Sequence, residues 1–274
     1  MESIRHRIYS HITIGGGEKQ KLDDVRASKP LLASSYKKLV KYVAEISYYN
    51  RKYNVYFRGQ DKEYLNRRKM TVIRPSFYRD YKSNNDINEQ LDKLKRADKI
   101  LVKKLSSYKG QHDETFKQFE EIRWAILQHY GVCKTPLIDL TTSLRAACSF
   151  ALNNNRESGI LYLLGLPNIN GSISFYVEEK LSILKLLCIC PPLALRPHFQ
   201  DGYLASTFPF DPKSFHMRYL DFSRRLLAKF KLVNTNGKFW SKEFMGIPEN
   251  ALYPNDEDEA YQICEDIKKS LESV

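Results

Sequence analysis

Three polar features of this chain combine residue types and spacings that could do chemistry. Arg58 ends a short apolar stretch, and a planar guanidinium binds carboxylates and phosphates through paired hydrogen bonds. His129 closes a helical pattern, while Asp139, Thr141 and Ser143 follow it at alternate positions. A cation, an imidazole and a row of oxygen atoms are the groups that bind an anionic, hydroxylated ligand and activate it.

The stretch "NVYFRGQ" predicts a buried strand that ends at the arginine. Val55, Tyr56 and Phe57 are β-branched or aromatic, which favours a strand, whereas Arg58 keeps its charge and needs a partner. The partner is either a carboxylate of the protein itself or the phosphate of a ligand, and both alternatives stay open.

His129 is predicted to lie on the inner face of a helix that covers residues 114–130. Phe119, Ile122, Ile126 and His129 follow each other at helical spacing, and Gly131 then ends the helix. A single histidine in this position is often a core residue bonded to backbone. Its place beside a polar turn makes a functional role the alternative.

The stretch "PLIDLTTS" places Asp139, Thr141 and Ser143 on one face of a strand over residues 137–140, if the strand continues that far. Ser143 is also the expected N-cap of a helix over residues 144–153. A helix N-terminus with hydroxyl groups favours an anion, although capping alone also explains the serine.

The remaining patterns predict an α+β fold in which helices come early and strands late. Residues 1–30 are expected to form a flexible or loosely docked lead-in, and residues 31–274 a single domain. Within that domain, a helical basic part covers about 31–130 and a sheet-rich part about 131–274. Further helices are expected at 34–49, 87–105 and 256–271, and strands at 160–164, 172–176 and 203–206.

The composition is that of a globular protein with 42% hydrophobic residues in 274. No apolar run reaches the ~18 residues of a membrane span, and the first residues lack a signal-peptide pattern, so we expect a cytoplasmic protein with no membrane contact. Five scattered cysteines fit a reducing compartment. The closest two, Cys188 and Cys190, are interpreted as small buried residues, and no metal site is expected.

The net charge of +12 is concentrated in the first half of the chain. Residues 1–130 carry 28 Lys and Arg against 16 Asp and Glu, whereas residues 131–274 carry 16 of each. The densest part, residues 62–109, has aromatic residues among the cations: Tyr64, Phe77, Tyr78, Tyr81 and Tyr108. This mixture suits single-stranded nucleic acid, and a solvated helix face is the equal alternative. The residues expected to bind nucleic acid are Arg67, Arg68, Lys69, Arg74 and Arg79.

Four stretches carry a resemblance to a known family. "YFRGQ", "RPSFYR", "QHYGVCKTPLIDLTTSLRAACSFAL" and "GIPENALYPNDEDEA" resemble, in order and spacing, the blocks of the FRG domain, over residues 53–260. That family is distantly similar to ADP-ribosyltransferases. The resemblance therefore implies an ADP-ribosyltransferase-like split β-sheet core, with the helical basic region on its N-terminal side.

The resemblance also implies site residues. Those expected to hold NAD are Arg58, Gly59, Gln60, Thr141, Thr142 and Ser143. These enzymes carry a glutamate on a later strand, and Gln200 is the residue of this chain that best matches its position in the family pattern. Glu178 and Glu179 are further options. His129, Asp139 and Gln200 are the expected catalytic residues.

The function implied is an NAD-dependent ADP-ribosyltransferase that modifies RNA or DNA, as a toxin or a phage-defence effector with a cognate inhibitor protein. Three alternatives remain open. The domain is a non-catalytic module that binds a nucleotide or nucleic acid, or it modifies protein, or it is a protein interaction domain in which Arg58 pairs with Asp139. An amide such as that of Gln200 cannot act as a base, which favours an acceptor with its own nucleophile.

Overall fold

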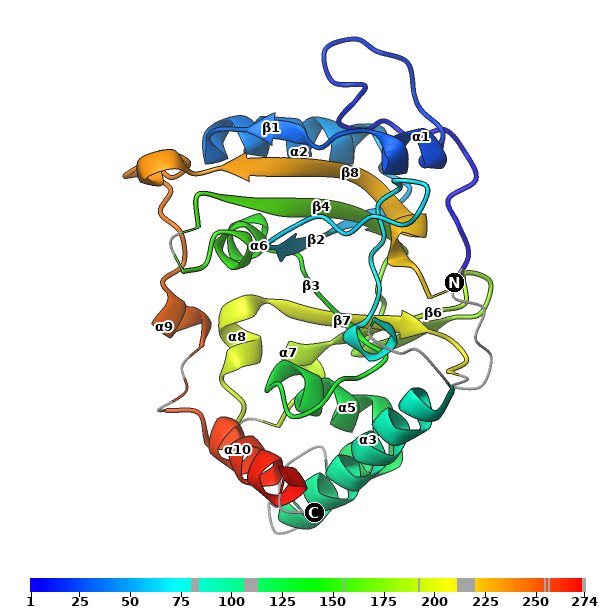
Figure 1. Cartoon of the computed structure of the whole chain (residues 1–274), viewed down its shortest axis with the longest axis vertical. Coiled ribbons are helices and arrows are strands. Elements are labelled where there is room, and N and C mark those ends of the chain that lie inside the picture. Colours follow the sequence, from blue (N-terminus) through cyan, green and yellow to red (C-terminus); the bar gives the residue numbers. More distant parts are fainter. Residues whose placement is uncertain are drawn as a thin grey trace. The chain divides into compact units, whose positions relative to one another are not determined.

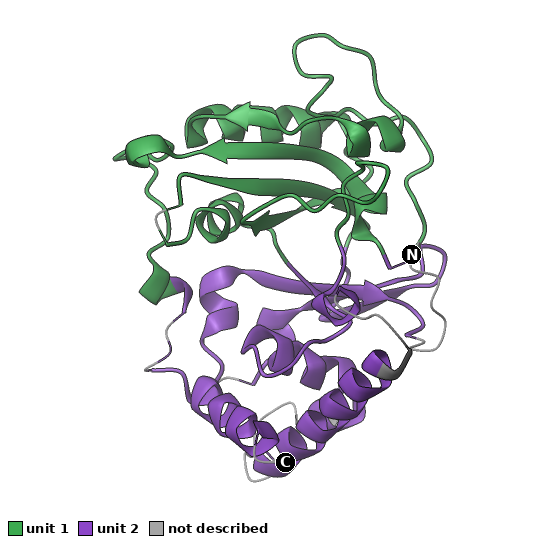
Figure 2. Ribbon diagram, in the orientation of Figure 1, with its two compact units in different colours: residues 1–73, 140–168, 221–251 green, residues 74–139, 169–220, 252–274 purple. Residues whose placement is uncertain are grey.

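The computed structural model describes residues 1–79, 84–105, 113–154, 156–191, 193–210, 220–253, 255 and 257–272, without the side chains of residues 84, 85 and 113–115. The fold is α+β, as expected from the sequence. The chain divides into two compact units (Figure 2). Unit 1 contains residues 1–73, 140–168 and 221–251, and unit 2 contains residues 74–139, 169–220 and 252–274.

Unit 1 is built around a mixed sheet (Figure 1). Its strands are β1 (Leu31–Ala33), β8 (Leu226–Val233), β4 (Ser158–Leu166) and β2 (Asn54–Gln60), in that order across the sheet. The β1–β8 pair is parallel, and the pairs β8–β4 and β4–β2 are antiparallel. The last residue of β3 (Ile138–Thr141) pairs with β2 on its other side, Thr141 opposite Phe57.

Three helices pack on this sheet. They are α1 (Leu22–Ala27), which contacts β8, α2 (Tyr36–Tyr49), which contacts β1, and α6 (Leu144–Ala151), which lies against β2 and β4. The first 30 residues, expected to be a loose lead-in, include α1 and bury Met1, Ile4 and Ile8. Apolar contacts therefore dock this segment onto unit 1.

Unit 2 has its own hydrophobic core between helices and a three-stranded antiparallel sheet. The strands are β5 (Ile173–Tyr176), β6 (Leu181–Lys185) and β7 (Gly202–Thr207). The helices are α3 (Asn84–Leu105), α4 (Asp113–Gln118), α5 (Glu120–His129), α7 (Leu186–Ile189), α8 (Arg196–Gln200) and α10 (Glu259–Glu272). Helix α3 packs on α5 and α10 through its apolar face, where Leu94, Ala97 and Leu101 are fully buried.

The helix predicted over residues 114–130 is two helices, α4 and α5. They are separated at Phe119, whose backbone is extended, with φ −107° and ψ 112°. The Arg123 guanidinium stabilises this break, because it donates to the carbonyl oxygens of Phe116 and Lys117 and pairs with Asp98 of α3 at 2.6 Å.

The predicted end of this helix is confirmed in detail. Gly131 has a φ of +65°, and its N–H donates to the Gln128 carbonyl while the Val132 N–H donates to the Leu127 carbonyl. These two bonds form a Schellman motif, in which a left-handed glycine closes the last helical turn.

Strands β1, β6 and β8 are absent from the sequence-based expectations. The division of residues 31–274 into a helical part and a sheet-rich part also differs from the two units, because each unit combines helices with strands from separate stretches of the chain. The remaining helix, α9 (Glu249–Leu252), lies at the end of the last unit 1 segment.

Candidate functional site

Arg58 and Gly59 of strand β2 face opposite sides of the unit 1 sheet. A Cβ on Gly59 would lie 1.8 Å from the carbonyl oxygen of Ala147, so Gly59 faces helix α6. Because successive strand residues alternate, Arg58 faces the other side of the sheet. The arginine and the glycine of the motif therefore have separate tasks.

Gly59 allows helix α6 to lie directly on the sheet. A second glycine, Gly159 of β4, also lies in contact with α6, because a Cβ there would lie 2.3 Å from the Ala151 carbonyl oxygen. On the helix side Ala146, Ala147 and Ala151 are fully buried. Small residues on both surfaces bring the two backbones together, which fixes the position of the turn before α6.

Arg58 belongs to a row of three polar side chains across the sheet. It pairs with Tyr162 of β4, and Tyr162 in turn pairs with Lys229 of β8. Residues directly opposite each other in antiparallel strands share a face, so all three side chains lie on the side away from α6. Gln60 has the same orientation, and its amide nitrogen lies 3.4 Å from the Tyr162 hydroxyl.

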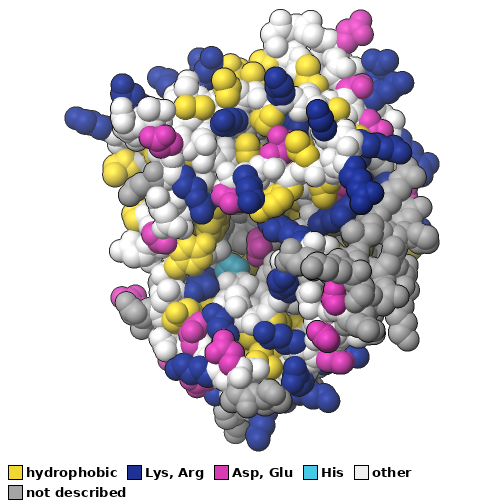
Figure 3. Space-filling view, viewed as in Figure 1, with side chains coloured by type: hydrophobic (Ala, Val, Ile, Leu, Met, Phe, Trp, Pro, Cys, Tyr) yellow, Lys and Arg dark blue, Asp and Glu magenta, His cyan; other side chains and the backbone are white. Residues whose placement is uncertain are grey.

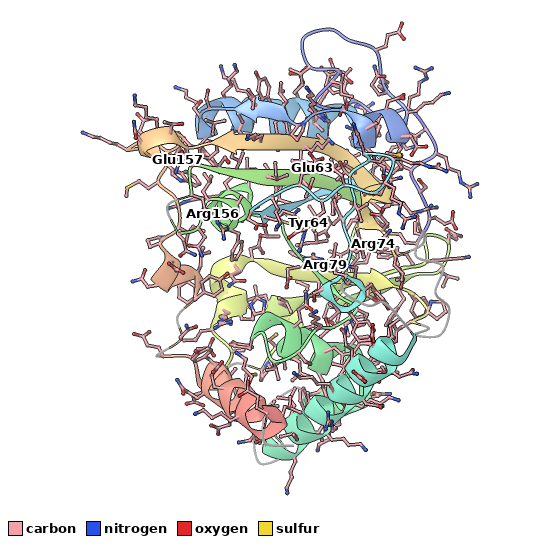
Figure 4. All side chains as sticks on the ribbon, viewed as in Figure 1. Glu63, Tyr64, Arg74, Arg79, Arg156 and Glu157 are labelled. Atoms are coloured by element: carbon pink, nitrogen blue, oxygen red, sulfur yellow. The ribbon has the colours of Figure 1, made fainter. Side chains whose placement is uncertain are left out.

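Lys229 is buried and anchors the segment that follows β2. Its ammonium donates to Glu63 Oε1 at 2.6 Å, to Thr71 Oγ1 at 2.7 Å and to the Arg26 carbonyl at 3.1 Å. Burial lowers the pKa of Lys229, and the Glu63 carboxylate acts against that shift. The segment therefore covers the face of the sheet that carries Arg58, and Glu63 and Tyr64 lie in front of the strands in Figure 4.

The anchored segment is a short hairpin, residues 62–72, which we call the cationic hairpin. A bridge joins Leu65 to Thr71, and Asn66 Oδ1 accepts from the N–H groups of Arg68 and Met70. Lys69 has a φ of +57°, which turns the chain at the tip. Three of the residues predicted to bind nucleic acid lie exposed at this tip: Arg67, Arg68 and Lys69.

The other two predicted nucleic-acid contacts, Arg74 and Arg79, lie in unit 2. Arg79 is exposed, and its guanidinium donates to the Arg74 carbonyl. Figure 3 shows Lys and Arg spread over the visible face with Asp and Glu among them, rather than one uninterrupted basic surface.

The aromatic residues of the basic region differ from the expectation. Phe77 and Tyr78 are buried in the core of unit 2, so neither ring is available to stack on a base. Tyr64 is 38% exposed, with the Lys62 ammonium 5.4 Å from the ring centre. Tyr81 and Tyr108 lie outside the described residues.

The predicted oxygen row ends earlier than expected. Strand β3 stops at Thr141, so Ser143 is not on the strand, and Asp139 is exposed whereas Thr141 is buried. Thr141 Oγ1 accepts from the Ser143 N–H at 2.9 Å, and Ser143 Oγ accepts from the Ala146 N–H at 3.2 Å. Ser143 is thus the N-cap of α6, as predicted. Thr142, between Thr141 and Ser143 in the sequence, is exposed.

Thr141 and Arg58 do not share a face of the sheet. Thr141 is opposite Phe57, which lies on the α6 side, whereas Arg58 lies on the other side. Of the predicted NAD-binding residues, unit 1 therefore brings Arg58 and Gln60 together on one face. Thr142 and Ser143 form the turn beyond the end of β3.

His129, Asp139 and Gln200 lie in unit 2. His129 Nε2 is enclosed, with no hydrogen-bond partner among the described residues, and burial lowers the pKa of this histidine to about 4, with the Asp139 carboxylate acting against the shift. The imidazole is therefore neutral at neutral pH. Asp139 accepts from the Gln128 amide at 3.0 Å, and Gln200 donates to the Leu252 carbonyl at 2.7 Å.

The further acidic options, Glu178 and Glu179, lie in the turn between β5 and β6, where Lys180 N–H donates to the Val177 carbonyl. Glu178 is exposed. Neither residue lies on a strand, unlike the glutamate implied by the resemblance.

A buried carboxylate that the sequence did not single out organises one end of unit 2. Asp258 Oδ2 accepts from the Tyr130 hydroxyl at 2.7 Å and from the N–H groups of Leu195 and Arg196 at 3.2 Å each. The Arg196 guanidinium lies 4.7 Å from the Tyr130 ring centre and donates to the His129 carbonyl. Asp258 precedes α10, and its Oδ1 caps that helix by accepting from the Tyr261 N–H at 3.3 Å. This capping position was the one signal in the sequence that could have identified it.

Two kinds of site are not found in the described part of the chain. It contains no group of three or more His, Cys, Asp or Glu residues that could hold a metal ion. None of the helices in those residues combines the length and apolar character of a membrane span. Of the two close cysteines, Cys190 is buried as predicted, but Cys188 is exposed on α7.

Comparison with known families gives a match over part of the chain. Residues 53–159 match the family model of the FRG domain. The match begins before β2 and ends at Gly159, so it contains Arg58, Gly59 and helix α6. No curated protein and no solved structure shows significant similarity to this chain.

Proposed function

We propose that the FRG domain at residues 53–159 belongs to an NAD-dependent ADP-ribosyltransferase that modifies nucleic acid. The observation that carries the proposal is the arrangement of one face of the unit 1 sheet. Arg58 lies on this face, and the cationic hairpin is anchored on the same face through Lys229. A dinucleotide site and a strand-binding site would thus adjoin each other.

The residues of unit 1 fit NAD in charge and in hydrogen-bonding type. The Arg58 guanidinium would bind the pyrophosphate with two parallel hydrogen bonds. Thr142 and Ser143 would bind ribose hydroxyls, since the Ser143 oxygen is already oriented by the Ala146 N–H. Thr141 would act through its bond to the Ser143 N–H, by holding the turn in place.

When bound, NAD supplies an ADP-ribose group whose bond to nicotinamide is weak. Unit 1 would hold its phosphates and ribose and position the acceptor, which replaces nicotinamide and loses a proton. An acceptor with its own nucleophilic atom, such as a nucleobase, needs least help from a protein base.

The cationic hairpin supports nucleic acid as the acceptor. The three exposed cations at its tip would neutralise phosphates without reading sequence, and the exposed Tyr64 ring offers a surface for one base. The hairpin is held by the ion pair between the buried Lys229 and the largely buried Glu63. The cations are therefore presented at a fixed place beside the Arg58 face.

The proposal is tested by incubating the full chain with labelled NAD and single-stranded RNA, single-stranded DNA or protein. We expect label on nucleic acid, and loss of both transfer and NAD binding in Arg58→Ala. The exposed Arg51 of the same unit provides a matched control, since Arg51→Ala removes the same charge from another place. Absence of transfer together with absence of NAD binding would exclude the proposed function. Label on protein alone would mean that the acceptor is protein and not nucleic acid.

One observation favours a second candidate, a module that binds a nucleotide without chemistry. Gln200 cannot act as a base, its amide is bonded to the Leu252 carbonyl, and the Glu63 carboxylate on the Arg58 face is paired with Lys229. In that case calorimetry would detect NAD binding that Arg58→Ala abolishes, while no label would be transferred to any acceptor.

A further inference from the structure

Unit 2 contains a cavity that the proposed function does not use. Its volume is about 580 Å³, within the range of roughly 300–1,000 Å³ that is typical of small-molecule sites. All of its lining residues belong to unit 2: Ser76, Gln90, Lys93, Gln128, Gly131, Val132, Cys133, Lys134 and Asp139. The cavity is open to solvent on one side and mostly polar side chains line it.

Gln90 contributes a hydrogen-bond acceptor that the protein leaves unsatisfied. Its Oε1 is enclosed, yet it has no hydrogen-bond partner among the described residues. A buried acceptor without a donor costs about 1–3 kcal/mol, so such atoms are rare unless something else binds them. Gln90 lines the cavity, so an N–H or O–H donor of a molecule bound there, or a water molecule, would satisfy this atom once the side chain turns toward it.

The Asp139 carboxylate is a second acceptor in the cavity, and Gln128 holds it in a fixed orientation. The Gln128 amide nitrogen donates to Asp139 Oδ2 at 3.0 Å and to the Leu137 carbonyl at 3.2 Å, while its oxygen accepts from the Thr135 hydroxyl. Gln128 is therefore fully bonded and acts as a brace for the Asp139 carboxylate. Carboxylate and amide oxygens in fixed positions suit the hydroxyl groups of a sugar.

Two cations complete the lining. Lys93 of α3 and Lys134 are both exposed and lie on the wall of the cavity. They outnumber Asp139, the one carboxylate of the lining, so the cavity has a net positive charge. Ammonium groups on the wall favour an anionic group, and lysine is a common ligand of phosphate.

We propose that this cavity binds a hydroxylated phosphate ester, of the sugar phosphate or nucleoside monophosphate class. Gln90 and Asp139 accept hydrogen bonds from its hydroxyl groups, and Lys93 and Lys134 bind its phosphate. All of the lining residues belong to unit 2 and Arg58 belongs to unit 1, and the proposal requires no transfer from NAD.

The test uses the full chain in an Arg58→Ala background, which separates this site from the one proposed for NAD. Calorimetric titrations with ribose 5-phosphate, with adenosine monophosphate and with inorganic phosphate identify the part of the ligand that is recognised. We expect the two esters to bind at least tenfold more tightly than inorganic phosphate. Equal affinity for all three, or no binding of the esters, would overturn the proposal.

Two variants and one control assign the binding to the cavity. Gln90→Leu should weaken binding of the esters about tenfold without lowering the stability of the protein, because it removes an unsatisfied acceptor. Lys93→Ala with Lys134→Ala should weaken it more strongly, whereas Lys99→Ala, another exposed lysine of α3, should not. Unchanged affinity in both cavity variants would overturn the proposal.

Cys133 provides a local readout that does not depend on these substitutions. Its thiol lines the cavity, and burial raises its pKa to about 12, with Lys93 acting against the shift. In a Cys188→Ser variant, which removes the exposed cysteine, alkylation of Cys133 at alkaline pH should slow several-fold when ribose 5-phosphate is bound. Alkylation at the same rate with and without the ester would place its binding elsewhere.

Discussion

Gly59 and Ala147 are in backbone contact, because a Cβ added to Gly59 would lie 1.8 Å from the Ala147 carbonyl oxygen. The residue before Gly59, Arg58, lies on the opposite face of the same strand. The two neighbours therefore serve different ends, since Gly59 fixes helix α6 on the sheet and Arg58 presents a charge on the other side. A defect in folding and a defect in binding should be separable at adjacent positions.

We expect Gly59→Ala to destabilise the protein by about 1–3 kcal/mol or more, because helix α6 must move away from β2 to admit the methyl group. Urea denaturation measures the change. Gly171→Ala is the matched control, since a Cβ there would meet nothing closer than 3.7 Å. Equal stability of the two variants would contradict the proposed contact.

Asp258→Ala should be among the most destabilising changes in unit 2. The buried carboxylate accepts from the Tyr130 hydroxyl and from two N–H groups at the start of α8, and hydrogen bonds to a charged group are worth about 1.5–3 kcal/mol each. We expect a loss of at least about 3 kcal/mol, and about 1 kcal/mol for Tyr130→Phe. Thermal denaturation compares both with Glu257→Ala, an exposed neighbouring acid that should be neutral.

The parts of the fold that local patterns determine were predictable from the sequence. Helices α2, α3 and α10 follow the 3.6-residue spacing of their apolar residues, and Gly131 ends α5 where a left-handed residue is required. Strand β8 was missed because Lys229 and Lys231 interrupt its apolar pattern. Lys229 is buried only because Glu63, 166 residues away, supplies the opposite charge.

In the candidate site, too, local patterns were predictable and long-range contacts were not. Ser143 as an N-cap follows from its place before an amphipathic helix, so it was predictable. The face on which Arg58 lies depends on the pairing of β2 with β4 and on a glycine contact with α6, and neither is encoded within a few residues. Phe77 and Tyr78 looked like stacking platforms because they lie among cations, and only tertiary packing shows that they are core residues.

Substitutions at the Lys229–Glu63 pair should be strongly non-additive. Lys229→Met leaves the Glu63 carboxylate half-buried without its cation, and breaking one partner of a buried pair costs about 3–5 kcal/mol. The double variant Lys229→Met with Glu63→Gln should cost less than the sum of the single variants. Urea denaturation completes the cycle, and trypsin cleavage at Arg67 and Arg68 reports release of the hairpin. Additive effects with unchanged cleavage would show that the pair does not anchor the hairpin.

Stability should fall as the pH decreases from about 6.5 to about 4. Burial lowers the pKa values of His11 and His129 to about 4, from 6.5 when unfolded, so in this window the unfolded chain binds protons that the folded protein does not. Each histidine contributes up to about 1.4 kcal/mol per pH unit. Urea midpoints measured across the window should show a shallower slope for His129→Gln than for the wild type. An identical slope would mean that His129 titrates normally.

The cationic hairpin gives the prediction that decides between nucleic acid and other acceptors. Arg67→Glu with Arg68→Glu and Lys69→Glu should abolish most binding to a labelled single strand, because three phosphate contacts are replaced by repulsion. It should leave NAD binding unchanged, since Arg58 and the residues 142–143 are untouched. The matched control reverses three exposed lysines of α2, Lys37, Lys38 and Lys41, which changes the net charge of unit 1 by the same amount at another place. In a salt series the wild type should lose affinity steeply, and the slope should decrease by about 2 in the hairpin variant. If the hairpin and α2 variants weaken binding equally, the attraction is a general effect of net charge, and nucleic acid is not the acceptor that the hairpin positions.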